Sequence, residues 1–178
     1  MSAIRGLDYG QLTTDGEHAV VTYYREFPHP PEQVWRALTE DQHLEAWFPT
    51  TIEGERKQGA HLTFRHRDID LPPMEGEIRA FDPPTLLELT WGPDTLRFEL
   101  EPDGNGTALT FKATMPELGK AARDGAGWHT CLANLAYELD GVKAPDSDWR
   151  ATHRVYQERF GREASTVGVP KEVDEAHG

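Results

Sequence analysis

The sequence predicts an α+β fold in which a curved antiparallel sheet of about six or seven strands wraps around one long helix. First, residues 125–141, GAGWHTCLANLAYELDG, form the longest stretch with helical periodicity. Second, short strand-like runs separated by turn residues precede this stretch, as expected for antiparallel hairpins. Third, two short helices are predicted directly after the first strand. This segregation of helices from strands argues against repeated βαβ units.

Residues 18–27, HAVVTYYREF, predict the first strand because they are rich in β-branched and aromatic residues and contain no Gly or Pro. The PHPP segment that follows ends this strand, and Pro31 suits the first position of a helix, where a missing N–H costs nothing. A second short helix through residues 44–48 ends before Pro49, because the residue before a proline disfavours helical geometry. We expect this helix pair to cap one end of the curved sheet.

From residue 50 onward, strand-like runs alternate with turns such as Gly92-Pro93. Within the longer runs, apolar side chains recur at every second position, which predicts strands with one buried face. Met74, Ile78 and Ala80, for example, are expected to share the inner face of one strand. The predicted strands of this meander are 51–53, 62–67, 74–81, 86–91, 94–100 and 107–114.

The long predicted helix has an apolar stripe and glycines near both ends. Gly125 and Gly127 are expected at its start, and Gly141 lies where a left-handed residue commonly ends a helix. Residues spaced three and four apart share one side of an α-helix, so the apolar stripe must be buried. Its members are Trp128, Cys131, Leu132, Leu135 and Leu139.

The length of 178 residues suits one well-buried core with an extension. We predict a domain over residues 1–142 with its core at 18–141, followed by a C-terminal extension over 143–178. The extension is expected to contain an amphipathic helix at about 146–161, with Asp146 or Ser147 as its N-cap, and then a mobile tail from about residue 165.

An aromatic stripe runs along the predicted helix of the extension. Trp149, Tyr156 and Phe160 fall on one side of it. Such a stripe either docks on the domain of the same chain or forms a contact between two copies, so it is also the candidate surface for a homodimer.

The composition excludes several classes of function. The chain has 31 acidic and 18 basic residues and a net charge of -13, which opposes nucleic acids and anionic membranes. No run approaches the roughly 20 apolar residues that span a bilayer, and the first residues lack a secretory signal. We therefore expect no membrane insertion and a cytoplasmic location. The single cysteine, Cys131, excludes a disulfide within the chain.

Three segments, in this order and spacing, carry a resemblance to a known family. They are VWRALTEDQHLEAWF (34–48), MEGEIRAFDPPTLLELTW (74–91) and GWHTCLANLAYELDG (127–141). Together they resemble the AHSA1-like family (activator of Hsp90 ATPase homologue 1-like) of the START-like, or SRPBCC, superfamily, over roughly residues 18–141. The chain departs from the family pattern at Gln58-Gly59, where two glycines are common.

The resemblance implies a helix-grip fold, in which a curved sheet wraps the long C-terminal helix and leaves an elongated cavity between them. It implies no single activity, because the superfamily includes lipid and hormone binders, polyketide cyclases, dioxygenase subunits and cochaperone domains.

Apolar residues predicted on the inner face form the candidate ligand-binding cavity, with His66 as its polar anchor. The alternative is that they simply fill the core. The candidate cavity residues are Trp47, Phe64, His66, Met74, Ile78, Leu89, Trp91, Phe98, Phe111, Trp128, Leu132 and Leu135.

No catalytic residues, metal ligands or cofactors are predicted. His61 and His66 lie five residues apart, on opposite faces of a strand, so they do not form a metal pair. We therefore hypothesise a non-enzymatic binder of a small hydrophobic or amphipathic molecule, lipid-like or polyketide-like. The alternatives are a protein-interaction or cochaperone-like module, and a cyclase-type or hydrolase-type enzyme that uses His66 for acid–base chemistry.

Overall fold

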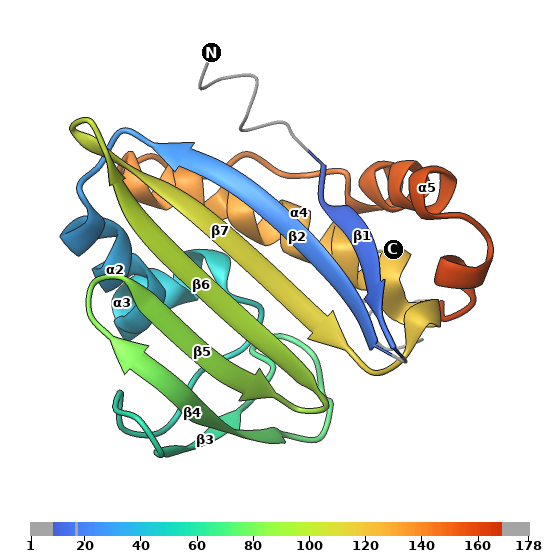
Figure 1. Cartoon of the computed structure of the whole chain (residues 1–178), viewed down its shortest axis with the longest axis horizontal. Helices are drawn as coiled ribbons and strands as arrows, with labels where there is room; N and C mark the ends of the chain where they lie inside the picture. Colours follow the sequence, from blue (N-terminus) through green and yellow to red (C-terminus); the bar gives the residue numbers. More distant parts are fainter. Residues whose placement is uncertain (1–8, 17, 169–178) are drawn as a thin grey trace.

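A computed structural model describes residues 9–16 and 18–168 and confirms the predicted α+β helix-grip architecture. Seven antiparallel strands form one sheet in the order β1-β2-β7-β6-β5-β4-β3. The sheet curves in front of the long helix α4 (Figure 1). The strands are β1 (Gln11–Asp15), β2 (His18–Phe27), β3 (His61–Phe64), β4 (Met74–Asp82), β5 (Leu86–Trp91), β6 (Asp94–Asp103) and β7 (Gly106–Met115). The helices are α2 (Pro31–Thr39), α3 (Asp41–Trp47), α4 (Ala121–Leu139) and α5 (Trp149–Phe160), with 3-10 turns η1 (Leu118–Lys120) and η2 (Glu163–Ser165).

Strand β1 was not predicted from the sequence. Its residues, QLTTD, are mostly polar, and it lies at the sheet edge and pairs only with β2. An edge strand with little apolar alternation gives no periodic signal. The predicted strand 51–53 is instead reduced to two isolated bridges, in which Thr50 pairs with His66 and Glu53 pairs with Thr63.

The two short helices lie where they were predicted, with Pro31 in the first turn of α2. They bury apolar residues including Leu44 and Trp47 against the core. The indole Nε1 of Trp47 donates a hydrogen bond to the carbonyl oxygen of Ala37 at 2.8 Å, which joins α3 to α2. This helix pair covers one end of the concave face (Figure 1).

Strand β4 departs from the predicted alternation at a bulge. Its register against β5 shifts between Ile78 and Ala80. A bulge reverses which residues face inward. Phe81, rather than Ala80, therefore packs against the core, where its ring lies 5.3 Å from that of Trp35.

The predicted start of the long helix was wrong. Helix α4 begins at Ala121, so Gly125 and Gly127 lie inside it. A side chain at Gly125 would bring its Cβ atom to 3.1 Å from Tyr156 and 3.2 Å from Phe160. Gly125 is thus the residue of α4 that α5 approaches closely, and it is not a flexible first residue of the helix. The predicted end is confirmed, since Gly141 has a φ of 71°.

Helix α5 docks on its own chain. Its N-cap is Asp148, which accepts a hydrogen bond from the Ala151 amide at 3.1 Å, in place of the predicted Asp146 or Ser147. Tyr156 is completely buried, whereas Trp149 and Phe160 are partly exposed. A homodimer contact through this stripe stays a prediction, and it would involve only the two partly exposed rings.

The chain after α5 folds back toward the start of α4. Ala164 in η2 is buried, and the Val167 amide donates a hydrogen bond to the carbonyl oxygen of Gly119 at 3.1 Å. The rest of the predicted mobile tail, residues 169–178, lies outside the described residues.

Replacing Gly125 by leucine should lower the melting temperature, because the new side chain would separate α5 from α4. We expect a loss of about 2 kcal/mol or more in the free energy of unfolding, as is typical of overpacked cores. The matched control is Gly127→Ala in the same helix, where an added Cβ meets nothing within 4 Å. The control should be neutral or stabilise the protein by up to about 1 kcal/mol. Equal stability of Gly125→Leu and the wild type in urea titrations would contradict this account of the helix contact.

Candidate functional site

The predicted cavity residues converge on the space between the sheet and α4. All except His66 belong to, or pack against, one hydrophobic cluster. Met74, Trp91 and His66 are partly exposed. The remaining nine are buried: Trp47, Phe64, Ile78, Leu89, Phe98, Phe111, Trp128, Leu132 and Leu135.

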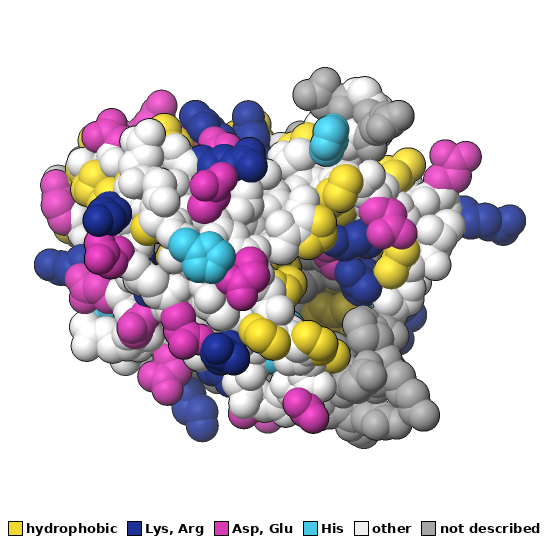
Figure 2. Space-filling view, turned by 90° about the horizontal axis from the view of Figure 1, so that it is seen from below, with side chains coloured by type: hydrophobic (Ala, Val, Ile, Leu, Met, Phe, Trp, Pro, Cys, Tyr) yellow, Lys and Arg dark blue, Asp and Glu magenta, His cyan; other side chains and the backbone are white. Residues whose placement is uncertain are grey.

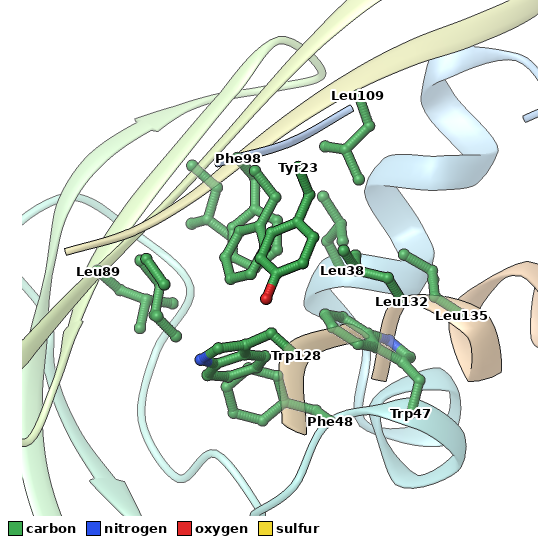
Figure 3. Packing of buried hydrophobic residues seen from close by; sticks show 14 of the residues in the cluster. Tyr23, Leu38, Trp47, Phe48, Leu89, Phe98, Leu109, Trp128, Leu132 and Leu135 are labelled. Carbon is green, nitrogen blue, oxygen red and sulfur yellow. The ribbon is translucent and has the colours of Figure 1, made fainter. Parts of the chain in front are cut away.

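The middle of this space is filled with aromatic rings. Phe98 and Phe111 stack with centroids 4.5 Å apart, and Tyr23 stacks on Phe111 at 5.8 Å. Trp128 of α4 meets the edge of Phe111 at 5.3 Å. Figure 3 shows the sheet residues Tyr23 and Phe98 facing Trp128 and Leu132 across the core. In the middle of the space, therefore, the inward-facing aromatic residues fill the core, which was the alternative to a cavity.

One end of the space, which we call the open end because residues there are partly exposed, is lined by three aromatic rings. They are Phe48, Trp91 and Trp128, which we call the aromatic triad. Trp91 lies 5.2 Å from Trp128 and 6.2 Å from Phe48, and Phe48 lies 5.7 Å from Trp128. Phe48 and Trp128 are buried, whereas Trp91, neighbouring Met74 and Cys131 of α4 keep partial exposure. The triad thus separates the packed core from solvent.

Polar groups surround the triad. The indole Nε1 of Trp91 donates a hydrogen bond to the hydroxyl of Thr50 at 3.3 Å, and Thr50 is completely buried. Arg67 donates a hydrogen bond from Nη1 to the carbonyl oxygen of Phe48 at 2.5 Å. Burial lowers the pKa of the half-buried His66, so its imidazole is neutral near pH 7.

The sequence did not single out three of these residues: Phe48, Thr50 and Arg67. Phe48 was assigned only to the end of a short helix, and Thr50 follows the proline that ends it. Arg67 alternates with His66 and was placed on the outer face. No periodic signal could have found them, because Phe48, Thr50 and Arg67 lie outside the helices and strands.

A second polar cluster lies between α4 and α5. The Tyr156 hydroxyl accepts a hydrogen bond from the Gly10 amide at 2.8 Å and lies 2.9 Å from Nδ1 of His129. The Tyr23 hydroxyl donates to the carbonyl oxygen of Gly125 at 2.5 Å. Tyr9 stacks on His129 with ring centroids 4.9 Å apart. This cluster fastens α5 and the segment before β1 to the core.

Two side chains of this cluster, His129 and Tyr156, have pKa values far from their usual ranges. Burial, with smaller contributions from Arg25 and Arg159, lowers the pKa of His129 to about 4. Burial raises the pKa of Tyr156 to about 12. Both groups are therefore neutral near pH 7, which lets the Tyr156 hydroxyl donate to Nδ1 of His129.

A buried ion pair joins β6 to the start of α4. The ammonium group of Lys120 lies 3.1 Å from the Asp94 carboxylate, whose side chain is only 2% exposed. Burial raises the pKa of Asp94 to about 6, although Lys120 opposes this shift. Asp94 lies opposite Trp91 in the sheet register, so this pair borders the open end.

No group of three His, Cys, Asp or Glu side chains within residues 9–16 and 18–168 is arranged to hold a metal ion. His61 is exposed and pairs with Glu75 at 2.5 Å, on the opposite side of β3 from the core.

Comparison with known proteins agrees with this geometry. A family model described as "Activator of Hsp90 ATPase homolog 1-like protein" matches residues 28–140. The chain belongs to this family. The match covers α2 through the end of α4 and leaves α5 outside the region that defines the activator-homologue family. No curated protein matches the chain in sequence.

Several solved structures share the fold. A conserved protein of unknown function, EF2215 from Enterococcus faecalis, superposes with a TM-score of 0.76 at 21% identity, covering 89% of this chain and 96% of that one. CalU16 from Micromonospora echinospora gives a TM-score of 0.65 at 17% identity, with coverages of 85% and 92%. A protein from Bordetella parapertussis gives 0.66 at 25% identity, with coverages of 85% and 91%. These coverages exceed the family match, so the neighbours extend beyond its core.

None of the helices in the described part of the chain combines the length and apolarity needed to cross a lipid bilayer.

Replacing Tyr156 by phenylalanine should destabilise the fold. The change removes the partner of the buried Gly10 amide and of His129, and unpaired buried polar groups cost about 1–3 kcal/mol. Tyr24→Phe is the matched control, because Tyr24 is 53% exposed. Chemical denaturation should separate the two variants, and equal unfolding free energies would show that the hydroxyl contributes nothing.

Stability should fall as the pH drops from about 6.5 toward 4 because of His129. Its folded pKa of about 4 lies below the ordinary value of 6.5, so only the unfolded chain gains a proton in this window. The contribution is fully present above pH 6.5 and amounts to roughly 3 kcal/mol. Asp94 acts in the opposite direction, losing stability as the pH rises from about 4 to 6.

The variant His129→Gln isolates the contribution of His129. The difference in unfolding free energy between variant and wild type cancels the contribution of Asp94, which both proteins contain. The variant should lose less stability than the wild type over this window in unfolding titrations. The matched control is His18→Gln, because His18 is exposed. Parallel curves for His129→Gln and wild type would contradict the assignment.

Proposed function

We propose that this protein binds a small hydrophobic or amphipathic molecule at the aromatic triad, between the sheet and α4, without catalysing a reaction. The observation that carries the proposal is the partial exposure of inward-facing Trp91, Met74 and Cys131 beside a completely buried core. Exposed apolar surface at a concave site favours an apolar ligand, because covering it removes that surface from water.

The fold supports the same proposal. Proteins of this fold commonly bind hydrophobic ligands, and the chain has the curved sheet and the long helix of that fold. The packed rings of Phe98 and Phe111 restrict the ligand to the open end, so we expect a compact molecule or one end of a longer one.

Viewed from the side on which β3 and β4 lie, the surface is hollowed. Hydrophobic side chains gather around this hollow, and both basic and acidic side chains lie beside it (Figure 2). An apolar floor with charged groups at its rim suits an amphipathic molecule better than a purely apolar one.

The test is a thermal-shift screen of fatty acids, fatty alcohols and aromatic polyketides against the full chain. A ligand present at about 100 times its dissociation constant should add roughly 2.7 kcal/mol of stability. Emission from Trp91 and Trp128 should change with the same ligands, because both indoles line the site. No stabilisation by any class would contradict the proposal.

Filling the open end should abolish binding. Cys131→Phe adds a ring where α4 faces the opening, and we expect affinity to fall at least tenfold while the protein stays folded. Tyr137→Trp is the control, because it enlarges an exposed side chain (39%) on another side of the same helix. Unchanged affinity in a folded Cys131→Phe variant would place the ligand elsewhere.

A further inference from the structure

Arg67 is held beside the aromatic triad by the backbone. Its Nη1 donates to the carbonyl oxygen of Phe48 at 2.5 Å, and Phe48 itself packs on Trp91 and Trp128. The guanidinium group has five N–H donors, so this one hydrogen bond leaves donors for another acceptor.

Within the described part of the chain, Arg67 has no carboxylate partner, which distinguishes it from nearby arginines. Arg65 pairs with Glu53 at 2.5 Å, and Arg56 pairs with Asp41 at 2.6 Å. The chain carries 31 acidic and only 18 basic residues, so acidic partners are abundant. A half-buried arginine that no carboxylate neutralises keeps its charge and its remaining N–H donors available for an anion.

The charge of Arg67 also reaches α4. Burial raises the pKa of the Cys131 thiol to about 12, and the charge of Arg67 opposes this rise. Arg67 is therefore close enough for its charge to act on the face of α4 that carries Trp128 and Cys131. The other titratable groups at this end are His66, which is neutral near pH 7, and Asp94, whose carboxylate is already paired with Lys120.

Resting on the proposed function, we infer that the ligand is an amphipathic carboxylate whose acid group binds Arg67 and whose apolar body covers Trp91 and Trp128. The planar guanidinium can bind a carboxylate through two parallel hydrogen bonds, which fixes the ligand's orientation. The negative net charge repels anions elsewhere on the protein, so binding should concentrate at this group.

The experiment compares dodecanoate with dodecanol, both below their micelle concentrations, by calorimetry and tryptophan fluorescence on the full chain. We expect dodecanoate to bind the wild type at least tenfold more tightly than dodecanol. Arg67→Gln should remove this preference and leave dodecanol binding unchanged. Arg67→Lys, which keeps the charge but not the paired donors, should give an intermediate preference.

Arg65→Gln is the matched control, because Arg65 is exposed and paired outside the site. It should bind both compounds as the wild type does. Equal wild-type affinity for dodecanoate and dodecanol would overturn this inference and leave the proposed function standing. Binding of neither compound would count against both. If Arg67→Gln fails to fold, the wild-type comparison and Arg67→Lys still decide the question.

Discussion

The rest of the structure depends on the packing of one indole, that of Trp128, against three separate parts of the chain. Its ring contacts Phe111 of β7, Trp91 of β5 and Phe48 after α3, with centroids 5.2 to 5.7 Å apart. A large rigid ring buries much apolar surface at low entropic cost. The sheet must curve for Trp91 of β5 and Phe111 of β7 to contact the same side chain of α4. The short helices must lie at the end of the sheet for Phe48 to reach Trp128.

A different side of α4 holds α5. Gly125 lets Tyr156 approach, and Tyr23 connects this contact to the core, because its ring stacks on Phe111 and its hydroxyl donates to the Gly125 carbonyl. The polar cluster around His129 therefore serves the attachment of α5. Trp128 lies on the side of α4 that faces the sheet. One side of α4 therefore holds α5, and another contributes to the candidate binding surface.

In the part of the chain that the structure describes, the candidate site combines apolar rings with an arginine that makes no ion pair, in an acidic protein. Most described arginines near it are neutralised by neighbouring carboxylates, whereas Arg67 is held by a backbone carbonyl. A carbonyl orients a guanidinium without neutralising its charge, and the charge then stays available to a ligand.

The sequence by itself determined the helix-grip class, the two short helices, the long helix and the inward position of eleven residues in or against the hydrophobic cluster, because apolar periodicity records which faces are buried. It missed β1 and the bulge in β4, since an edge strand and a single inserted residue carry no period. It misread Gly125 as a helix start, because a glycine that allows flexibility and one that allows close approach look alike in a sequence. Only the tertiary structure decided that Phe48, Thr50 and Arg67 surround the open end, because loop residues are brought together by contacts distant in sequence.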